Sequence, residues 1–406
     1  MDDKLYTDEK EGIPFLRVQN VSENGLILED VKFITKEVHN NLLKRSQVLE
    51  DNLLITITGR IASSCVAPKG FIGNINQHSV VIKTKKRKIS ELIASFLNSK
   101  IGHKLALRRT SGGSRPALDY TALKSIPIIF EEKIIQIMDN AYKIKKQKEM
   151  EAQQLLDSID EFVLNELGIK LPELKDRMTF AVNSDDIKGK RADAYYHHPK
   201  FEEVEKAIEE GKYDVKELNE YIEFTPGFAF PSNYYVKENG IKLLTIKNIK
   251  KDGIDFSNVT LLPKDFYDKF SKFQIRQDDI LFAMTGATIG KVNIFITKER
   301  VLLNQRVGIL RVIDNKINNY YLFSFMNTRV FKNKIIRQSC GGAQPNISES
   351  EITSIKIPYP PLKIQNKIAE EVKRRMQKAE ILQKEAKQLL QEAKEKVEKI
   401  IFNYTS

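Results

Sequence analysis

The strongest constraint on the fold is a long helical segment in the last part of the sequence. Pro360 and Pro361 suit the first turn of a helix, and no Gly or Pro follows them over about forty residues. A helix that is polar on its other sides needs a partner along its length. Apolar residues recur there in two seven-residue rows, typical of a coiled coil: Val372, Ala379, Ala386, Ala393 and Ile400, and Ile368, Leu382 and Leu389.

A second helical segment, residues 131–167, also lacks Gly and Pro and supplies the expected partner. Lys145 and Lys148 interrupt its middle. At 1.5 Å per residue, helices of about 37 to 40 residues span roughly 55 to 60 Å. We expect the two helices to pair as an antiparallel coiled coil. The apolar rows of this second segment are Ile134, Ala141, Leu155 and Phe162, and Met138, Ala152 and Ile159.

The sequence that precedes each helix is an internal repeat. Segments that resemble each other recur in the same order, at an offset of about 228 residues, which indicates a duplication. We therefore expect an α+β fold with an internal pseudo-two-fold repeat of two globular recognition domains, each followed by a long helix. The matched pairs are 13–21 with 241–249, 51–59 with 278–286, 76–77 with 304–305, and 112–113 with 341–342.

The repeat also predicts the domain boundaries. We expect a first domain over residues 1–130, a helix over 131–167, a linker over 168–195, a second domain over 196–360 and a helix over 361–406. About 45 residues lie between Tyr196 and the strand that begins at Ile241, whereas twelve precede the matching strand at Ile13. The first domain is therefore expected to lack its opening strand region.

Composition limits the class of protein. The chain has 406 residues and a formal net charge of +12, which favours polyanionic partners, although lysines that only solubilise the surface are the alternative. No apolar run is long enough for a membrane span, so we expect no membrane partner. Cys65 and Cys340 are the only cysteines, too few for a disulfide framework. We expect a cytoplasmic protein.

These features together resemble a known family. The segment Pro358-Tyr359-Pro360-Pro361-Leu362-Lys363-Ile364-Gln365 is similar to the junction between recognition domain and helix in the DNA-specificity subunits of type I restriction–modification systems. The loops 285–290 and 341–347 resemble other landmarks of that family, and the order of domain, helix, domain, helix covers nearly the whole chain.

The resemblance implies a non-catalytic DNA reader without a cofactor. Each recognition domain would read one half of an interrupted site in double-stranded DNA, and the helices would set the gap. The helices would also dock two adenine-N6 methyltransferase subunits, to which restriction and translocase subunits can add. Two alternatives stay open: a free-standing DNA-binding or regulatory protein, and a coiled-coil adaptor without sequence specificity.

Two motifs suggest other chemistry on first inspection. Gly286–Lys291 has three residues between its glycines, and Val292 follows where a phosphate-binding loop requires Ser or Thr. A tight turn between strands is the better interpretation. His197-His198-Pro199 has no partner at metal-ligand spacing, so we expect a surface turn before a helix and no metal site. No residue is assigned a catalytic role.

Candidate DNA contacts are Arg, Lys, Gln and Thr side chains on loops, because a loop can enter a groove while a scaffold holds it. A run of basic residues, 83–88, follows an apolar strand and is expected on a loop near phosphates. A solvated surface role is the alternative for each candidate. The candidates are Arg60, Lys85, Lys86, Arg87, Lys88 and Arg115 in the first domain, and Thr288, Lys291, Arg306 and Gln344 in the second.

Basic residues in the helices form a second candidate group. Lys145 and Lys148 stand where a simple spacer helix would carry Leu, and we expect Arg374 and Arg375 to face them. We interpret these four residues as a docking site for partner subunits or as contacts to nearby DNA backbone.

Overall fold

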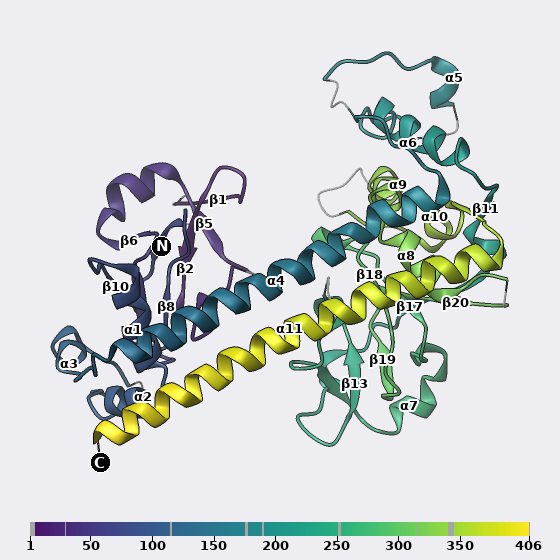
Figure 1. Ribbon diagram of the computed structural model, residues 1–406. Helices are drawn as coiled ribbons and strands as arrows, with labels where there is room; N and C mark the ends of the chain where they lie inside the picture. Colours follow the sequence, from purple (N-terminus) through teal and green to yellow (C-terminus); the bar gives the residue numbers. More distant parts are fainter. Residues whose placement is uncertain are drawn as a thin grey trace. The chain divides into compact units, whose positions relative to one another are not determined.

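The computed structural model describes residues 5–28, 30–113, 116–174, 178–188, 191–250, 253–314, 316–339 and 345–405. The chain divides into two compact units, Met1–Ala152 with Glu380–Ser406, and Gln153–Ala379. Two long helices, α4 (Glu132–Leu167) and α11 (Leu362–Thr405), contribute a part to each unit. Figure 1 shows each of them as one continuous helix. Both units combine helices with sheets, so the predicted α+β fold class is confirmed.

The first unit contains two larger sheets, with strand orders β1-β5-β2-β9-β6 and β10-β7-β8, and the small strand pair β3-β4. Strands β2 and β9 run parallel, and the other pairs are antiparallel. Its strands are β1 (Tyr6–Thr7), β2 (Ile13–Leu16), β3 (Val21–Ser22), β4 (Gly25–Leu26), β5 (Lys32–Ile34), β6 (Gln47–Leu49), β7 (Leu53–Thr56), β8 (Ser64–Val66), β9 (Ile72–Ile75) and β10 (Ser79–Ile82). Its short helices are α1 (Arg87–Leu97), α2 (Lys100–Leu107) and α3 (Tyr120–Lys124).

The second unit has sheets with strand orders β12-β20-β17-β18 and β16-β13-β19 and two smaller strand pairs. Its strands are β11 (Val215–Glu217), β12 (Ile222–Pro226), β13 (Ile241–Leu244), β14 (Ile249–Lys250), β15 (Gly253–Ile254), β16 (Thr260–Leu262), β17 (Ile280–Ala283), β18 (Val292–Ile294), β19 (Val301–Leu303), β20 (Val307–Val312) and β21 (Lys356–Pro358). Its short helices are α5 (Ser184–Ile187), α6 (Pro199–Glu209), α7 (Phe266–Lys269), α8 (Asn319–Met326), α9 (Arg329–Ser339) and α10 (Glu349–Thr353).

The two units share their strand order. The order β5-β2-β9 corresponds to β16-β13-β19, and the β2–β9 and β13–β19 pairs are both parallel. The order β10-β7-β8 corresponds to β20-β17-β18. Strand β12 has no counterpart among the described strands of the first unit, because β12 flanks β20 whereas β10 has β7 as its one strand neighbour among the described residues. Sequence segments that match at an offset of about 228 residues therefore take matching places.

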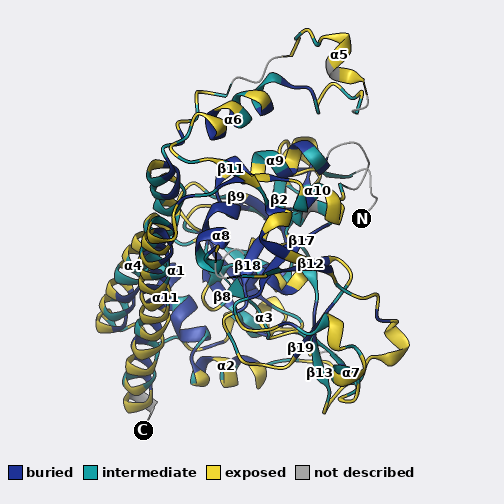
Figure 2. Cartoon of the chain, turned by 90° about the vertical axis from the view of Figure 1, so that its right-hand side faces the viewer, coloured by how far each residue is buried: buried dark blue, intermediate teal, exposed yellow. Residues whose placement is uncertain are grey.

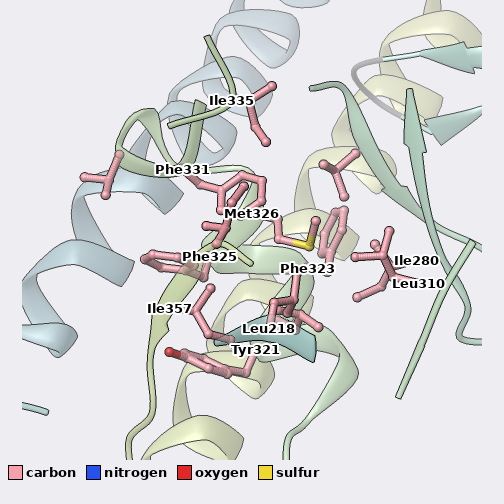
Figure 3. Close-up of a cluster of buried hydrophobic side chains, with 14 of the residues drawn as sticks. Leu218, Ile280, Leu310, Tyr321, Phe323, Phe325, Met326, Phe331, Ile335 and Ile357 are labelled. Atoms are coloured by element: carbon pink, nitrogen blue, oxygen red, sulfur yellow. The ribbon is translucent and has the colours of Figure 1, made fainter. Parts of the chain in front are cut away.

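The largest core of the second unit forms around α8, whose sequence NYYLFSFM is apolar on nearly all sides and is correspondingly buried. Figure 3 shows Tyr321, Phe323, Phe325 and Met326 of this helix among side chains from the strands and from α9. The Tyr321 hydroxyl donates to the carbonyl oxygen of Pro358 at 2.6 Å, so this buried phenol is paired.

The two long helices pack against each other inside each unit. In the second unit Glu166 of α4 contacts Lys367 of α11, and Ser158 of α4 contacts Arg375 of α11. Ser158 lies eight residues before Glu166, whereas Arg375 lies eight residues after Lys367. The two helices therefore run antiparallel. Figure 2 shows buried and exposed residues along both helices. The apolar side chains that share a core are Ile134, Met138, Ala141, Leu390, Ala393, Val397 and Ile401 in the first unit, and Val163, Leu164, Leu167, Ile368 and Val372 in the second.

A buried glutamine joins α11 to the domain before it. Gln365 is fully buried, and its amide nitrogen donates to the carbonyl oxygens of Pro360 at 2.8 Å and Lys316 at 3.2 Å. Its amide oxygen accepts from the backbone N–H of Asn318 at 2.8 Å, and Asn318 caps α8. The glutamine therefore fixes the start of the long helix against the start of α8. Among the described residues, no helix is long and apolar enough to cross a membrane.

Candidate nucleic-acid interface

The strand register of the second unit brings several loops to one end of its main sheet. Ala283 at the end of β17 pairs with Val307 at the start of β20, and Pro226 at the end of β12 pairs with Gly308. The backbone N–H of Met284 donates to the carbonyl oxygen of Arg306 at 3.0 Å. Loops 284–291, 304–306 and 227–230 therefore meet at this end. The predicted residues Thr288, Lys291 and Arg306 all belong to these loops.

Loop 284–291 joins two antiparallel strands, β17 and β18, so the prediction of a strand-to-strand turn is confirmed. A phosphate-binding loop would lead into a long helix instead. The turn contains a 3-10 segment, η9 (Gly286–Thr288), in which the Thr288 hydroxyl donates to the Thr285 carbonyl oxygen at 3.4 Å. Gly290 has φ of 76°, a conformation that favours glycine, and Lys291 beside it is exposed. The loop thus presents a hydroxyl and an ammonium on a defined backbone.

Arg306 is exposed in the turn before β20, and Gln305 beside it is exposed as well. Both side chains belong to types that recognise base edges through two hydrogen bonds, Arg with guanine and Gln with adenine. We did not predict Gln305, although the repeat pairs it with Gln77. Gln344 lies outside the described residues, and so does Arg115 of the first unit.

The first unit gathers the matching loops at the matching end of its sheets. Thr56 at the end of β7 pairs with Ser79 at the start of β10, which places loops 57–62 and 76–78 together. Arg60 lies here, and its Nη2 donates to the carbonyl oxygen of Val18 at 3.2 Å. Gln77 and His78 are exposed at the positions that correspond to Gln305 and Arg306. Sequence reasoning missed both, although the repeat itself was a signal for them.

The basic run 83–88 lies at the other end of β10, about 13 Å along a four-residue strand. It is therefore not brought together with Arg60. Lys85 and Lys86 are exposed before α1, but the expectation of a loop fails for Arg87 and Lys88, which form the first turn of that helix.

Arg87 and Lys88 each have an acidic partner. Arg87 contacts Asp51 at 2.6 Å and Glu91 at 2.7 Å. Lys88 lies 3.8 Å from Asp139. The Arg87 guanidinium thus joins the turn before β7 to α1, which is a structural role. Lys83, Lys85 and Lys86 are exposed members of the run that could meet phosphate.

The four basic residues of the helices do not form one cluster. Lys148 pairs with Glu385 at 2.7 Å, and Lys145 with Glu149 on its own helix at 2.7 Å. Arg375 donates to Ser158, so the expectation that Arg374 and Arg375 face Lys145 and Lys148 is wrong. The antiparallel register places Arg375 beside a different part of α4 from the one we expected.

Glu371 on α11 holds both of these arginines. Arg374 contacts its carboxylate at 2.7 Å and Arg375 at 2.8 Å. The hydrogen bonds from Arg374 and then Arg375 lower the pKa of Glu371 to about 2. Arg374 is the most exposed of the three, so among them it is best placed to meet a partner.

The described residues include no cluster of three or more His, Cys, Asp or Glu side chains that could hold a metal ion. The turn before α6 is confirmed, but His197 and His198 are buried rather than at the surface. His198 accepts from the backbone N–H of Lys200 and caps the helix, and His197 contacts the Arg191 carbonyl oxygen. Burial raises the pKa of the Cys65 thiol to about 12, which leaves it without nucleophilic thiolate at neutral pH.

Comparisons with known proteins agree on one family. The sequence model described as the type I restriction modification DNA specificity domain matches residues 210–391. The type I restriction enzyme MjaVIII specificity subunit of Methanocaldococcus jannaschii is 25% identical over 401 residues, which cover 97% of this chain and 86% of that protein. The putative MjaX specificity subunit of the same organism is 23% identical over 404 residues, with coverage of 96% and 86%.

A solved structure gives a weaker likeness. The crystal structure of a type I restriction-modification system S subunit from M. genitalium aligns over 98% of this chain and 91% of that chain, at 13% identity and a TM-score of 0.46. The assignment therefore rests on the sequence matches, which extend over both units. Residues 210–391 thus match the type I restriction modification DNA specificity domain, and nearly the whole chain is similar in sequence to type I restriction enzyme specificity subunits.

Proposed function

We propose that this chain is the non-catalytic subunit that reads a split DNA site for a type I restriction–modification complex. The observation that carries the proposal is the matched placement of loops in the two units. Loops 57–62 and 76–78 in one unit, and 284–291 and 304–306 in the other, extend from the same end of the same strand order. The loop sequences differ, so each unit would read a different half-site.

Within this proposal, residues 1–130 and 196–360 are the two recognition domains, residues 168–195 are a linker, and the helices over 131–167 and 361–406 are the spacer. Exposed Gln and basic side chains would contact bases, namely Gln77 and His78 in one domain and Gln305 and Arg306 in the other. Arg60, Thr288 and Lys291 would support them, with Lys85 and Lys86 on phosphates. The net charge of +12 supports a polyanionic partner.

The helices would serve the rest of the complex. Two adenine-N6 methyltransferase subunits would dock on the exposed sides of α4 and α11, and restriction and translocase subunits would join them. Exposed Arg374 is the best placed of the predicted docking residues, because Lys148 and Arg375 bond the other helix of the pair.

The decisive experiment is co-purification with the methyltransferase subunit encoded beside this chain, followed by adenine methylation of random-sequence DNA and mapping of the methylated sites. We expect a split motif with two unlike halves that is methylated when this chain is present. If no complex forms and no motif emerges, the free-standing binder or the adaptor becomes the better account.

A further inference from the structure

The second unit presents an exposed phenyl ring beside the turn that carries its candidate base contacts. Phe228 lies in loop 227–230, which follows β12, and the residue is 37% exposed. Its backbone N–H donates to the Leu303 carbonyl oxygen at 3.0 Å, and its own carbonyl oxygen accepts from the N–H of Gln305 at 3.0 Å. Both backbone groups of Phe228 are therefore fixed against the turn that carries Gln305 and Arg306.

A glycine allows this close approach of the two segments. A Cβ on Gly227 would collide with the backbone of Asn304, so a larger residue there would push the loop away from the turn. Backbones that are paired by hydrogen bonds in this way lie about 5 Å apart. Because base pairs are stacked about 3.4 Å apart, Phe228 lies within about two base-pair steps of any base that Gln305 contacts.

Three other aromatic rings hold the Phe228 ring in place. The ring centroids of Phe230, Phe270 and Phe273 lie 5.0, 5.1 and 5.2 Å from its own. These three rings belong to a cluster that packs on β13 and β19, which lie near α7 in Figure 1. A side chain that inserts between base pairs must project freely, since a base stacks on each of its faces. The braced ring of Phe228 instead offers a fixed apolar surface.

A fixed apolar surface beside Gln and Arg side chains matches one feature of DNA. Gln pairs with adenine and Arg with guanine through two hydrogen bonds in the major groove. In that groove the thymine base adds a C5-methyl group to the base edges, and Phe is among the side chains that contact it. A phosphate group has no apolar surface, so contact with the DNA backbone would leave the ring without a partner of its own kind.

We propose that Phe228 contacts the C5-methyl group of a thymine in the half-site of the second unit, within about two base pairs of the bases beside Gln305 and Arg306. Phe228 is then a residue that determines specificity at a position which hydrogen bonds alone do not read. This inference rests on the proposed function, and it adds the chemistry of one recognised base.

The test uses the full chain assembled with the methyltransferase subunit, after the methylated motif has been mapped. Each thymine of the motif is replaced in turn by deoxyuridine, which lacks only the methyl group, and binding is measured by fluorescence anisotropy at fixed salt. We expect a replacement in one half-site to weaken binding about three- to sixfold, as loss of one buried methyl group would. This measurement needs no variant of the protein.

Variants of the protein assign the contact to Phe228. In Phe228→Ala the same deoxyuridine replacement should have no effect, and Phe228→Leu should keep part of the effect, because leucine still offers an apolar surface. Tyr234→Ala is the matched control, since Tyr234 is 47% exposed and its ring packs on Phe266 at 5.3 Å. The control should keep the full difference between thymine and uracil. Circular dichroism checks that each variant is folded.

Two results would overturn this proposal while the proposed function stands. One is a methylated split motif in which no deoxyuridine replacement weakens binding, and the other is a thymine effect that persists unchanged in Phe228→Ala. Weaker DNA binding by Phe228→Ala without any thymine effect would also overturn it. A rise in 2-aminopurine fluorescence in the native complex would then assign the ring to insertion between bases, and weaker methyltransferase binding would assign it to the protein partner. Absence of any motif would overturn both proposals.

Discussion

The guanidinium of Arg375 on α11 donates two hydrogen bonds to Ser158 on α4, at 2.9 Å to its carbonyl oxygen and 2.8 Å to its hydroxyl. The same group lies 4.6 Å from the centroid of the Phe162 ring and contacts Glu371. Arg375 interrupts an apolar row of the sequence, yet in the structure it joins the two helices. A charged residue in a helical seam can thus act as a connection between helices.

We therefore expect Arg375→Ala to lower the free energy of unfolding by about 1 to 3 kcal/mol, because it removes charge-assisted hydrogen bonds and leaves polar groups of Ser158 without their donor. The measurement is urea denaturation followed by circular dichroism. Arg374→Ala is the matched control, since Arg374 contacts the same Glu371 but is 64% exposed. That control should cost about 0 to 1 kcal/mol. Equal losses in the two variants would contradict the assigned connection.

Glu371 gives a prediction for acid stability. Hydrogen bonds from Arg374 and Arg375 lower its pKa from 4.5 to about 2 in the folded chain. A carboxylate with a lowered folded-state pKa stabilises the fold above its unfolded pKa and loses that effect as pH falls towards the folded value. The stability difference between the native chain and Glu371→Gln should therefore shrink between about pH 4.5 and pH 2. Denaturation at a series of pH values checks this, and a constant difference across that window would refute it.

Gln365 links α11 to the domain that precedes it, and its replacement tests how much that link contributes to folding stability. Gln365→Ala should cost about 2 to 4 kcal/mol of folding stability, because the side chain is fully buried and makes three hydrogen bonds to backbone groups. Gln388→Ala is the control, since Gln388 is exposed on the same helix and bonds Glu392. We expect that control to change stability by less than about 0.5 kcal/mol. A similar small effect at Gln365 would show that the junction does not depend on it.

The long helices and the repeat were accessible to sequence reasoning because both are periodic signals. The predicted helices over 131–167 and 361–406 compare with Glu132–Leu167 and Leu362–Thr405 in the structure. The partners of charged residues were not accessible, since they depend on contacts distant in sequence. Arg87 meets Asp51 across 36 residues, and Arg375 meets Ser158 across 217. The sequence alone does not show whether a basic residue has a partner in the folded chain.

The candidate site illustrates the same limit. Arg60, Lys291 and Arg306 were chosen because they adjoin glycine or a strand end, and the strand register brings Lys291 and Arg306 to one end of the sheet. Gln77, His78 and Gln305 were missed because the prediction favoured Arg and Lys beside Gly or Pro, and none of the three is such a residue. The repeat would have found them, since it places both pairs directly before equivalent strands, β10 and β20.

Arg306 provides the sharpest prediction about recognition. If it pairs with a base in the half-site of the second unit, Arg306→Ala should lose about 1 to 3 kcal/mol of discrimination at one base-pair position and leave the other half-site unchanged. Arg300→Ala is the control, because Arg300 lies before β19, at the other end of that strand from the turn with Arg306, and pairs with Asp268. The measurement is methylation-site mapping with the assembled complex, compared at fixed salt because phosphate contacts vary with it. If sequence specificity is relaxed at one base-pair position in Arg306→Ala and not in Arg300→Ala, Arg306 contacts a base. A uniform loss across all sequences would instead assign Arg306 to the phosphate backbone, and relaxation of the other half-site would contradict the assignment of one half-site to each unit.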